Sequence, residues 1–137
     1  MVHSEHFGTL WIFLMSRFRI TAEQGAREPF SLTSIDYVYT IAEDPDLTNE
    51  ILTYHWASEA APPQRTYPHL HIGSCILNDA YRTKPASFPK LHIRTDQIPV
   101  AAFILMLIEE FGVSPLRSSW RHDLTATIAA RSQDRAI

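Results

Sequence analysis

The stretch SIDYVYTIAE, residues 34–43, decides the fold, because a large apolar residue recurs in it at every second position. Side chains point alternately to the two faces of a β-strand, so this spacing predicts a strand that buries one face. The same alternation recurs in EILTYHWA, residues 50–57. The segment between them, EDPDLTN, is rich in residues that favour turns. We therefore predict an antiparallel hairpin.

Three further segments have the composition of strands. Residues 9–21 are apolar and rich in β-branched or aromatic side chains, with a short helix as the alternative. Residues 69–77 and 90–95 again alternate aliphatic with polar residues. Proline-bearing loops, residues 60–68 and 78–89, precede these two strands. The first two thirds of the chain is thus predicted to be a run of strands joined by loops.

An apolar helix is predicted to follow the strands. Pro99 favours a helix start, since the N–H that proline lacks has no partner in the first turn of a helix. In PVAAFILMLIEEFG, residues 99–112, apolar residues recur at helical spacing, and Gly112 suits the position just after a helix. The helix is apolar nearly all round, so we expect it to be deeply buried or to contact another chain.

A last helix is expected over about residues 119–131, where apolar residues are spaced four apart: Trp120, Leu124 and Ile128. Strands followed by helices indicate an α+β fold. We predict an antiparallel sheet of about four or five strands, followed by two C-terminal helices packed on one face. The length fits a single domain over residues 1–137, with flexible ends at the first few residues and at about 132–137.

The composition argues against several classes of protein. Hydrophobic residues make up 45% and charged residues 20% of the chain, which is typical of a globular domain. The longest apolar run, residues 100–108, is too short to span a bilayer, so no membrane association is expected. Glu5 precedes the apolar TLWIFLM and no small-residue cleavage site follows, so we expect no signal peptide. Cys75 is the only cysteine, which fits a cytoplasmic protein without intrachain disulfides.

Charge is distributed unevenly along the chain. Residues 36–64 carry six acidic residues and no Lys or Arg, whereas residues 65–94 carry five basic residues and one acidic residue. The basic part also contains three of the seven histidines. It would suit a phosphate-containing ligand such as RNA or a nucleotide, and the alternative is an ordinary solvated surface.

The alternation within each strand predicts which residues share the sheet face opposite the helices. We assume that the core face carries the large apolar residues of each strand, which are Tyr54 and Trp56, Leu70 and Ile72, and the aliphatic residues of 90–95. The residues next to them in the sequence then face away from the core. These neighbours are His55, His69, His71, Cys75, His92 and Arg94, and the same rule adds Asp36 and Thr40. If the strands are adjacent, four histidines converge. The alternative is that they are polar residues on a wet face without chemistry.

Acid–base cleavage of a phosphodiester is the chemistry that these residues suit best. Histidine is the side chain whose ordinary pKa lies near neutrality, so one imidazole can remove a proton while another delivers one. Arg94 would stabilise the developing negative charge on the phosphate. The predicted catalytic residues are His55, His69, His71, His92 and Arg94, and no cofactor is required.

A metal site is an alternative use of the same residues. His69 and His71 would have Cα atoms about 6.5 Å apart on one strand face, so both imidazoles could reach one ion. Zinc would need a third ligand, with His92, His55 or Cys75 as the alternatives. No C-x-x-C or H-E-x-x-H pattern is present, so no metal is favoured; if one binds, the expected ligands are His69, His71 and His92.

The order of these parts resembles an uncharacterised family of small bacterial proteins. In that family a hairpin ending in YHW precedes PHLH, a segment like HIPTGRIP and a helix like FLIEEFGV. The matching residues here are 54–56, 68–71, 92–99 and 103–113, followed by Trp120. The resemblance implies no activity.

The tyrosine-rich hairpin followed by a Pro–His-rich strand also resembles the TumE-type toxins of bacterial toxin–antitoxin pairs. The denser histidine clusters of that family are absent here. This resemblance implies a small toxin that a protein partner neutralises.

Together these observations predict a small histidine-dependent protein that cleaves nucleic acid or acts as a toxin, in the manner of a metal-independent ribonuclease or phosphodiesterase. The alternative from another class is a non-enzymatic interaction module, such as an antitoxin, immunity protein or regulatory partner. That module would bind a protein partner, or a second copy of the chain, through the apolar helix 99–111.

Overall fold

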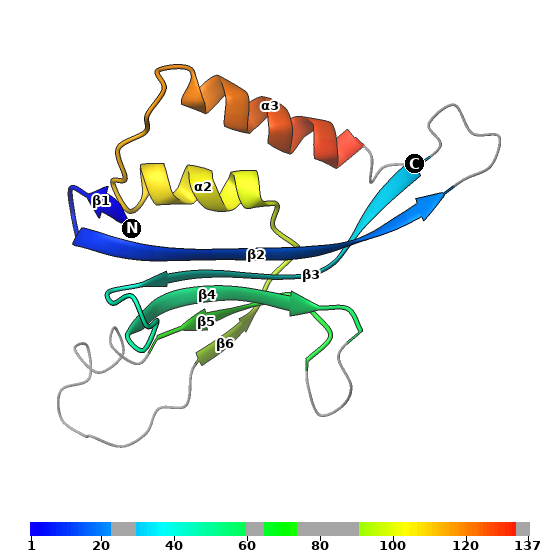
Figure 1. Cartoon of the computed structure of the whole chain (residues 1–137), viewed down its shortest axis with the longest axis horizontal. Helices are drawn as coiled ribbons and strands as arrows, with labels where there is room; N and C mark the ends of the chain where they lie inside the picture. The colour runs from blue at the N-terminus through cyan, green and yellow to red at the C-terminus, as the bar shows by residue number, and fades with distance from the viewer. Residues whose placement is uncertain (23–29, 60–64, 74–90, 134–137) are drawn as a thin grey trace.

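The computed structural model describes residues 1–22, 30–59, 65–73 and 91–133, and it confirms the predicted α+β fold. Six antiparallel strands form one sheet in sequence order, and two C-terminal helices follow (Figure 1). The strands are β1 (Val2–Ser4), β2 (Gly8–Ala22), β3 (Phe30–Ala42), β4 (Glu50–Ala57), β5 (His69–Ile72) and β6 (Leu91–Arg94). The helices are α2 (Val100–Glu109) and α3 (Trp120–Gln133).

The sheet has one strand more than the four or five predicted, because β1 also pairs with β2. Val2 lies opposite Leu10, and Ser4 is buried and donates a hydrogen bond to the Phe111 carbonyl oxygen just after α2. Three residues are too few for a periodic signal, so only these contacts reveal the strand. The alternative of a short helix in residues 9–21 is wrong, since β2 covers that segment.

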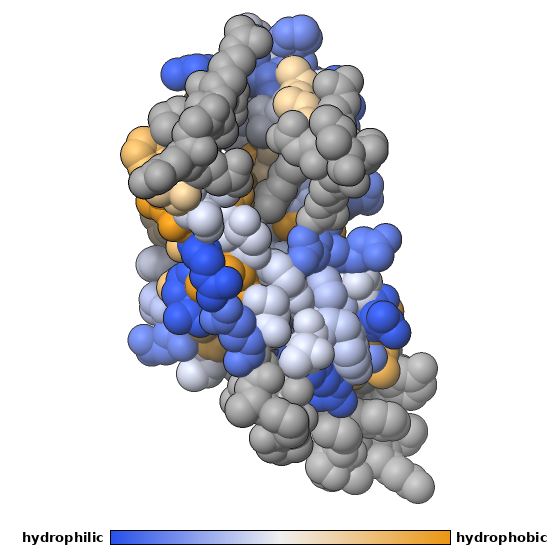
Figure 2. All heavy atoms as spheres, turned by 90° about the vertical axis from the view of Figure 1, so that its right-hand side faces the viewer, coloured by the Kyte–Doolittle hydropathy of each residue, from blue (hydrophilic) through white to orange (hydrophobic). Residues whose placement is uncertain are grey.

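β2 and β3 extend beyond the rest of the sheet as a two-stranded ribbon. Their pairing continues to Ala22 opposite Phe30, so β3 begins four residues before the predicted start at Ser34. On one face of this ribbon Ile20 lies opposite Leu32, and both are about two-thirds exposed. Figure 2 views the molecule from the end at which the ribbon projects, and hydrophobic patches reach the surface there between hydrophilic ones.

β5 ends at a glycine that the packing requires. A Cβ atom on Gly73 would lie only 1.5 Å from the carbonyl oxygen of Glu50 on the neighbouring strand. The Gly73 N–H instead donates a hydrogen bond of 2.9 Å to the Ile51 carbonyl oxygen. The rest of the predicted strand 69–77, the loop 78–89 and the last four residues of the chain lie outside the described residues.

The core forms between one face of the sheet and α2, which lies between the sheet and α3 in Figure 1. Tyr37 and Tyr39 stack with ring centroids 4.7 Å apart, and Tyr39 contacts Phe103 of α2 at 5.3 Å. Phe103 is fully buried, and Tyr54 meets its ring edge-on at 6.2 Å. The predicted alternation of residues 34–43 therefore supplies the core, as expected of a half-buried strand.

α2 begins and ends where the sequence predicts. Pro99 is the N-cap with extended backbone, and Gly112 has a positive φ of 64° just after the helix. Only one side of α2 is deeply buried, through Ala101, Phe103 and Leu107. Among the described residues, no helix has the length and apolar character needed to cross a membrane.

Candidate functional site

The register of β4, β5 and β6 brings four histidines together on the sheet face opposite α2. Tyr54 pairs with Leu70 on the core face, so the next residues along, His55 and His69, pair on the opposite face. One step further, His71 pairs with His92 of β6. We call the set His55, His69, His71 and His92 the histidine cluster. The predicted convergence of these four side chains is therefore present.

Each of the four imidazoles lies within ring-contact distance of at least two of the others. The ring centroids of His71 and His92 are 4.3 Å apart, and those of His69 and His71 are 4.8 Å apart. His55 lies 5.2 Å from His69 and 6.0 Å from His71, and His92 lies 5.4 Å from His69. His69 and His71 form the centre of the cluster, because each contacts the other three rings.

The histidine cluster is largely buried from solvent. His69 is only 3% exposed, and His55, His71 and His92 are half-buried. Beside the cluster, Thr40 and Thr53 are also buried and share a hydrogen bond of 3.0 Å between their hydroxyl groups. Burial of this many polar groups on the sheet face away from the helices is unusual for a solvated strand surface.

A backbone contact determines which nitrogen of His69 can act as an acceptor. The Nδ1 atom lies 2.8 Å from the carbonyl oxygen of Tyr67. A carbonyl oxygen can only accept, so Nδ1 carries the proton and donates it. In the neutral ring, Nε2 then holds the lone pair that can take a proton or bind a metal ion.

Burial favours the neutral form of His55. Desolvation lowers its pKa from the ordinary value of 6.5, and the neighbouring His69 lowers it further, while Asp36 acts in the opposite direction. A neutral imidazole is the form that acts as a general base or as a metal ligand.

Arg94 lies at the edge of the cluster. It is paired with His69 across β5 and β6, is exposed, and its guanidinium carbon lies 5.2 Å from the centroid of the Tyr67 ring. Next to it is a polar pocket of about 460 Å³ lined by Pro68, Arg94, Thr95, Asp96 and Gln97. The Thr95 hydroxyl oxygen is buried and has no hydrogen-bond partner among the described residues.

An ion pair on the same face was not predicted to belong to the site. Asp36 is 5% exposed and accepts hydrogen bonds from the guanidinium of Arg17, one of them 2.6 Å long from Nε. Its Oδ1 atom is buried and has no hydrogen-bond partner among the described residues. The sequence offered one signal, since the alternation of residues 34–43 places Asp36 on the same face as the histidines. The partner Arg17 is visible only from the register.

The ring nitrogens of three histidines form a group that could hold a metal ion. One nitrogen each of His55, His69 and His71 lies within 4.8 Å of the others. The ligand set expected from the sequence contained His92 in place of His55, and the structure favours His55. The remaining alternative ligand, Cys75, lies outside the described residues, as do Arg82, Lys84 and Lys90 of the basic segment.

Comparison of the chain with protein-family models, curated protein sequences and solved structures found no match. The resemblances noted from the sequence therefore stay predictions.

Proposed function

We propose that this protein is a histidine-dependent enzyme that cleaves phosphodiester bonds in RNA or a related nucleotide. The observation that carries the proposal is the histidine cluster itself, four imidazoles from three adjacent strands with centroid distances of 4.3–6.0 Å. Arg94 on the same face supplies a positive charge for the phosphate. In such a cluster a neutral imidazole can act as the base and a protonated one as the acid.

In the proposed reaction, a neutral imidazole removes the proton from the attacking hydroxyl group, which is a water molecule or a ribose 2′-OH. The new P–O bond forms as the bond to the leaving oxygen breaks, and a protonated imidazole gives its proton to that oxygen. We assign the acid role to His92, which shares β6 with Arg94 and lies at the edge of the cluster. The guanidinium of Arg94 stabilises the extra charge on the phosphate in the transition state.

The same proposal includes a cytoplasmic, toxin-like role with a protein partner that neutralises the activity. A single cysteine is ordinary in a reducing compartment, where RNA is also abundant.

The test is cleavage of a fluorescent RNA oligonucleotide and of bis(p-nitrophenyl) phosphate by tag-free protein. We expect His92→Asn to lower the rate at least about 100-fold with an unchanged melting temperature. His122→Asn is the matched control, because His122 is exposed on α3, far from the cluster in the fold. Absence of cleavage by the wild-type chain, or full activity of His92→Asn, would contradict the proposal.

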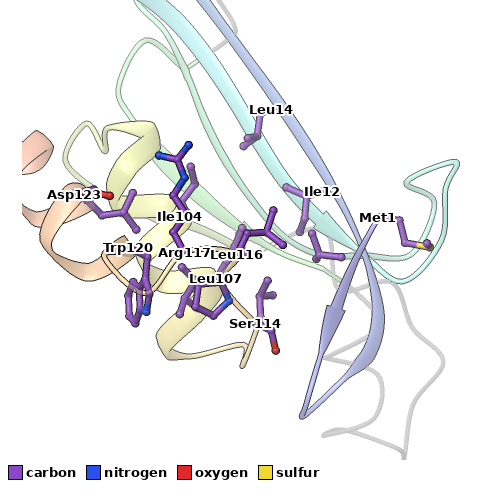
Figure 3. Close-up of a pocket in the computed structure, with 15 residues that line it drawn as sticks. Met1, Ile12, Leu14, Ile104, Leu107, Ser114, Leu116, Arg117, Trp120 and Asp123 are labelled. Carbon is purple, nitrogen blue, oxygen red and sulfur yellow. The ribbon is translucent and has the colours of Figure 1, made fainter.

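A second candidate function, an interaction module, is favoured by an apolar pocket on the other side of the sheet. The pocket has a volume of about 590 Å³ and lies between β2, α2 and α3 (Figure 3). Leu14 of β2, 44% exposed, and Ile104 and Leu107 of α2 line it, together with Trp120 of α3. The predicted binding helix 99–111 therefore contributes one wall of an open apolar surface, which suits a protein partner or a second copy of the chain.

A further inference from the structure

Three members of the histidine cluster lie close enough together to be candidate ligands of one metal ion. The ring nitrogens of His55, His69 and His71 lie within 4.8 Å of one another. Nitrogens that share a tetrahedral zinc ion are roughly 3.4 Å apart, from a Zn–N distance of about 2.0–2.1 Å. The three residues project from the same face of two paired strands, so rotation of their side chains would bring the nitrogens closer to that spacing.

The environment of His69 matches that of a metal-bound histidine. A ligating imidazole commonly donates its other N–H to a backbone carbonyl, which orients the ring and directs the lone pair at the metal. His69 makes this contact through Nδ1 to the Tyr67 carbonyl oxygen and is 3% exposed. Because Nδ1 donates to the backbone, Nε2 is the nitrogen of His69 that is left to bind a metal ion.

We infer that His55, His69 and His71 bind one divalent transition-metal ion, with zinc as the ion that best fits three neutral imidazoles. A three-histidine set leaves a coordination position for water, which is the arrangement of catalytic rather than structural zinc sites. His92 packs against His71 at 4.3 Å, is not part of the three-nitrogen group, and is assigned no bond to the metal.

This inference deepens the proposed function. A catalytic role for the metal rests on the proposed cleavage of phosphodiester bonds, whereas binding of the metal does not depend on it. When bound, the metal would activate a water molecule as the nucleophile in place of an imidazole base. His55, His69 and His71 would hold the ion, and His92 would give its proton to the leaving oxygen as the P–O bond to that oxygen breaks.

The test is titration of tag-free, chelator-treated protein with zinc sulfate by calorimetry, and with cobalt(II) by visible absorption. We expect one equivalent to bind with a dissociation constant below about 1 μM. His55→Asn and His71→Asn should each weaken binding at least about 100-fold, whereas the control His122→Asn should change it less than tenfold. His92→Asn weakening binding as much as His71→Asn would overturn the three-ligand assignment.

A thermal readout covers the case in which a variant folds poorly. Zinc in large excess should raise the melting temperature of the wild type by at least about 5 °C and that of His71→Asn by much less. Failure of zinc and cobalt to bind the wild type overturns the inference, and cleavage that persists in EDTA then still supports the proposed function. Tight binding without any cleavage supports the metal site and overturns the proposed function instead.

Discussion

His71 and His92 lie directly opposite each other on β5 and β6, with ring centroids 4.3 Å apart. A slip of one residue in this pairing would move one of the rings to the core face of the sheet. The histidine cluster therefore depends on the register of two strands of only four residues each. An interaction that stabilises this register therefore also stabilises the histidine cluster.

Gly73 is predicted to hold the register, so Gly73→Ala should disrupt both the fold and the cluster. The added Cβ atom would overlap the Glu50 carbonyl oxygen, and such overpacking against backbone costs about 3 kcal/mol or more. Urea denaturation measures the loss, and zinc titration measures the effect on the cluster. Gly8→Ala is the comparison, because a Cβ there meets nothing within 4 Å and only its positive φ opposes the change. Equal stability of the two variants would contradict this account of Gly73.

Arg94→Gln should lower kcat/KM for phosphodiester cleavage by about 100-fold, because it removes the positive charge expected to stabilise the transition state. Arg94→Lys should recover part of the rate, since it restores the charge without the planar guanidinium. Arg117→Gln is the control, because Arg117 lines the apolar pocket on the other side of the sheet. Steady-state kinetics that are unaffected by Arg94→Gln would remove Arg94 from the proposed site.

Asp44 should make the stability of the β3–β4 loop depend on acid pH. Hydrogen bonds to its carboxylate lower the pKa of Asp44 below the ordinary 3.8. The bond from the Asn49 N–H has the largest effect, and Thr48 and the Asp46 N–H donate the others. The ionised carboxylate is therefore favoured by folding. The contribution of Asp44 to the free energy of unfolding is fully present well above pH 3.8. It is lost as the pH falls through the lowered pKa of Asp44.

The measurement is the melting temperature of wild type and Asp44→Asn as a function of pH. We expect the variant to be less stable at neutral pH and the difference to shrink below pH 3.8. Asp46→Asn makes the same charge change in the same loop, but the Asp46 carboxylate accepts none of these bonds, so it should have little effect. A constant difference across the pH range would show that ionisation of Asp44 does not matter.

Self-association should depend on the exposed apolar face of the β2–β3 ribbon. Ile20 and Leu32 lie opposite each other and are 68% and 64% exposed, so Ile20→Glu places a charge in the middle of this face. We expect wild-type dimers in sedimentation velocity at micromolar concentration and mainly monomers of Ile20→Glu, with similar melting temperatures. Thr21→Glu, on the other face of the same ribbon, should not dissociate the dimer. A wild type that stays monomeric would refute self-association through this surface.

The sequence by itself determined the order of the elements from β3 onward and the sheet face on which the side chains of β3 to β6 lie. The spacing of apolar residues such as Tyr37 and Tyr39, or Leu70 and Ile72, predicts which residues face the core. Side chains alternate between the two faces of a strand, so the same spacing puts His55, His69 and His71 on the opposite face. Pro99 and Gly112 likewise marked the ends of α2, since their backbone preferences are local.

Only the tertiary structure decided which residues meet across strands. Register depends on contacts between segments far apart in the chain, so no local pattern showed that His55 faces His69 or that Arg17 reaches Asp36. The choice of His55 rather than His92 in the three-nitrogen group has the same origin, because a distance between ring nitrogens belongs to the assembled sheet.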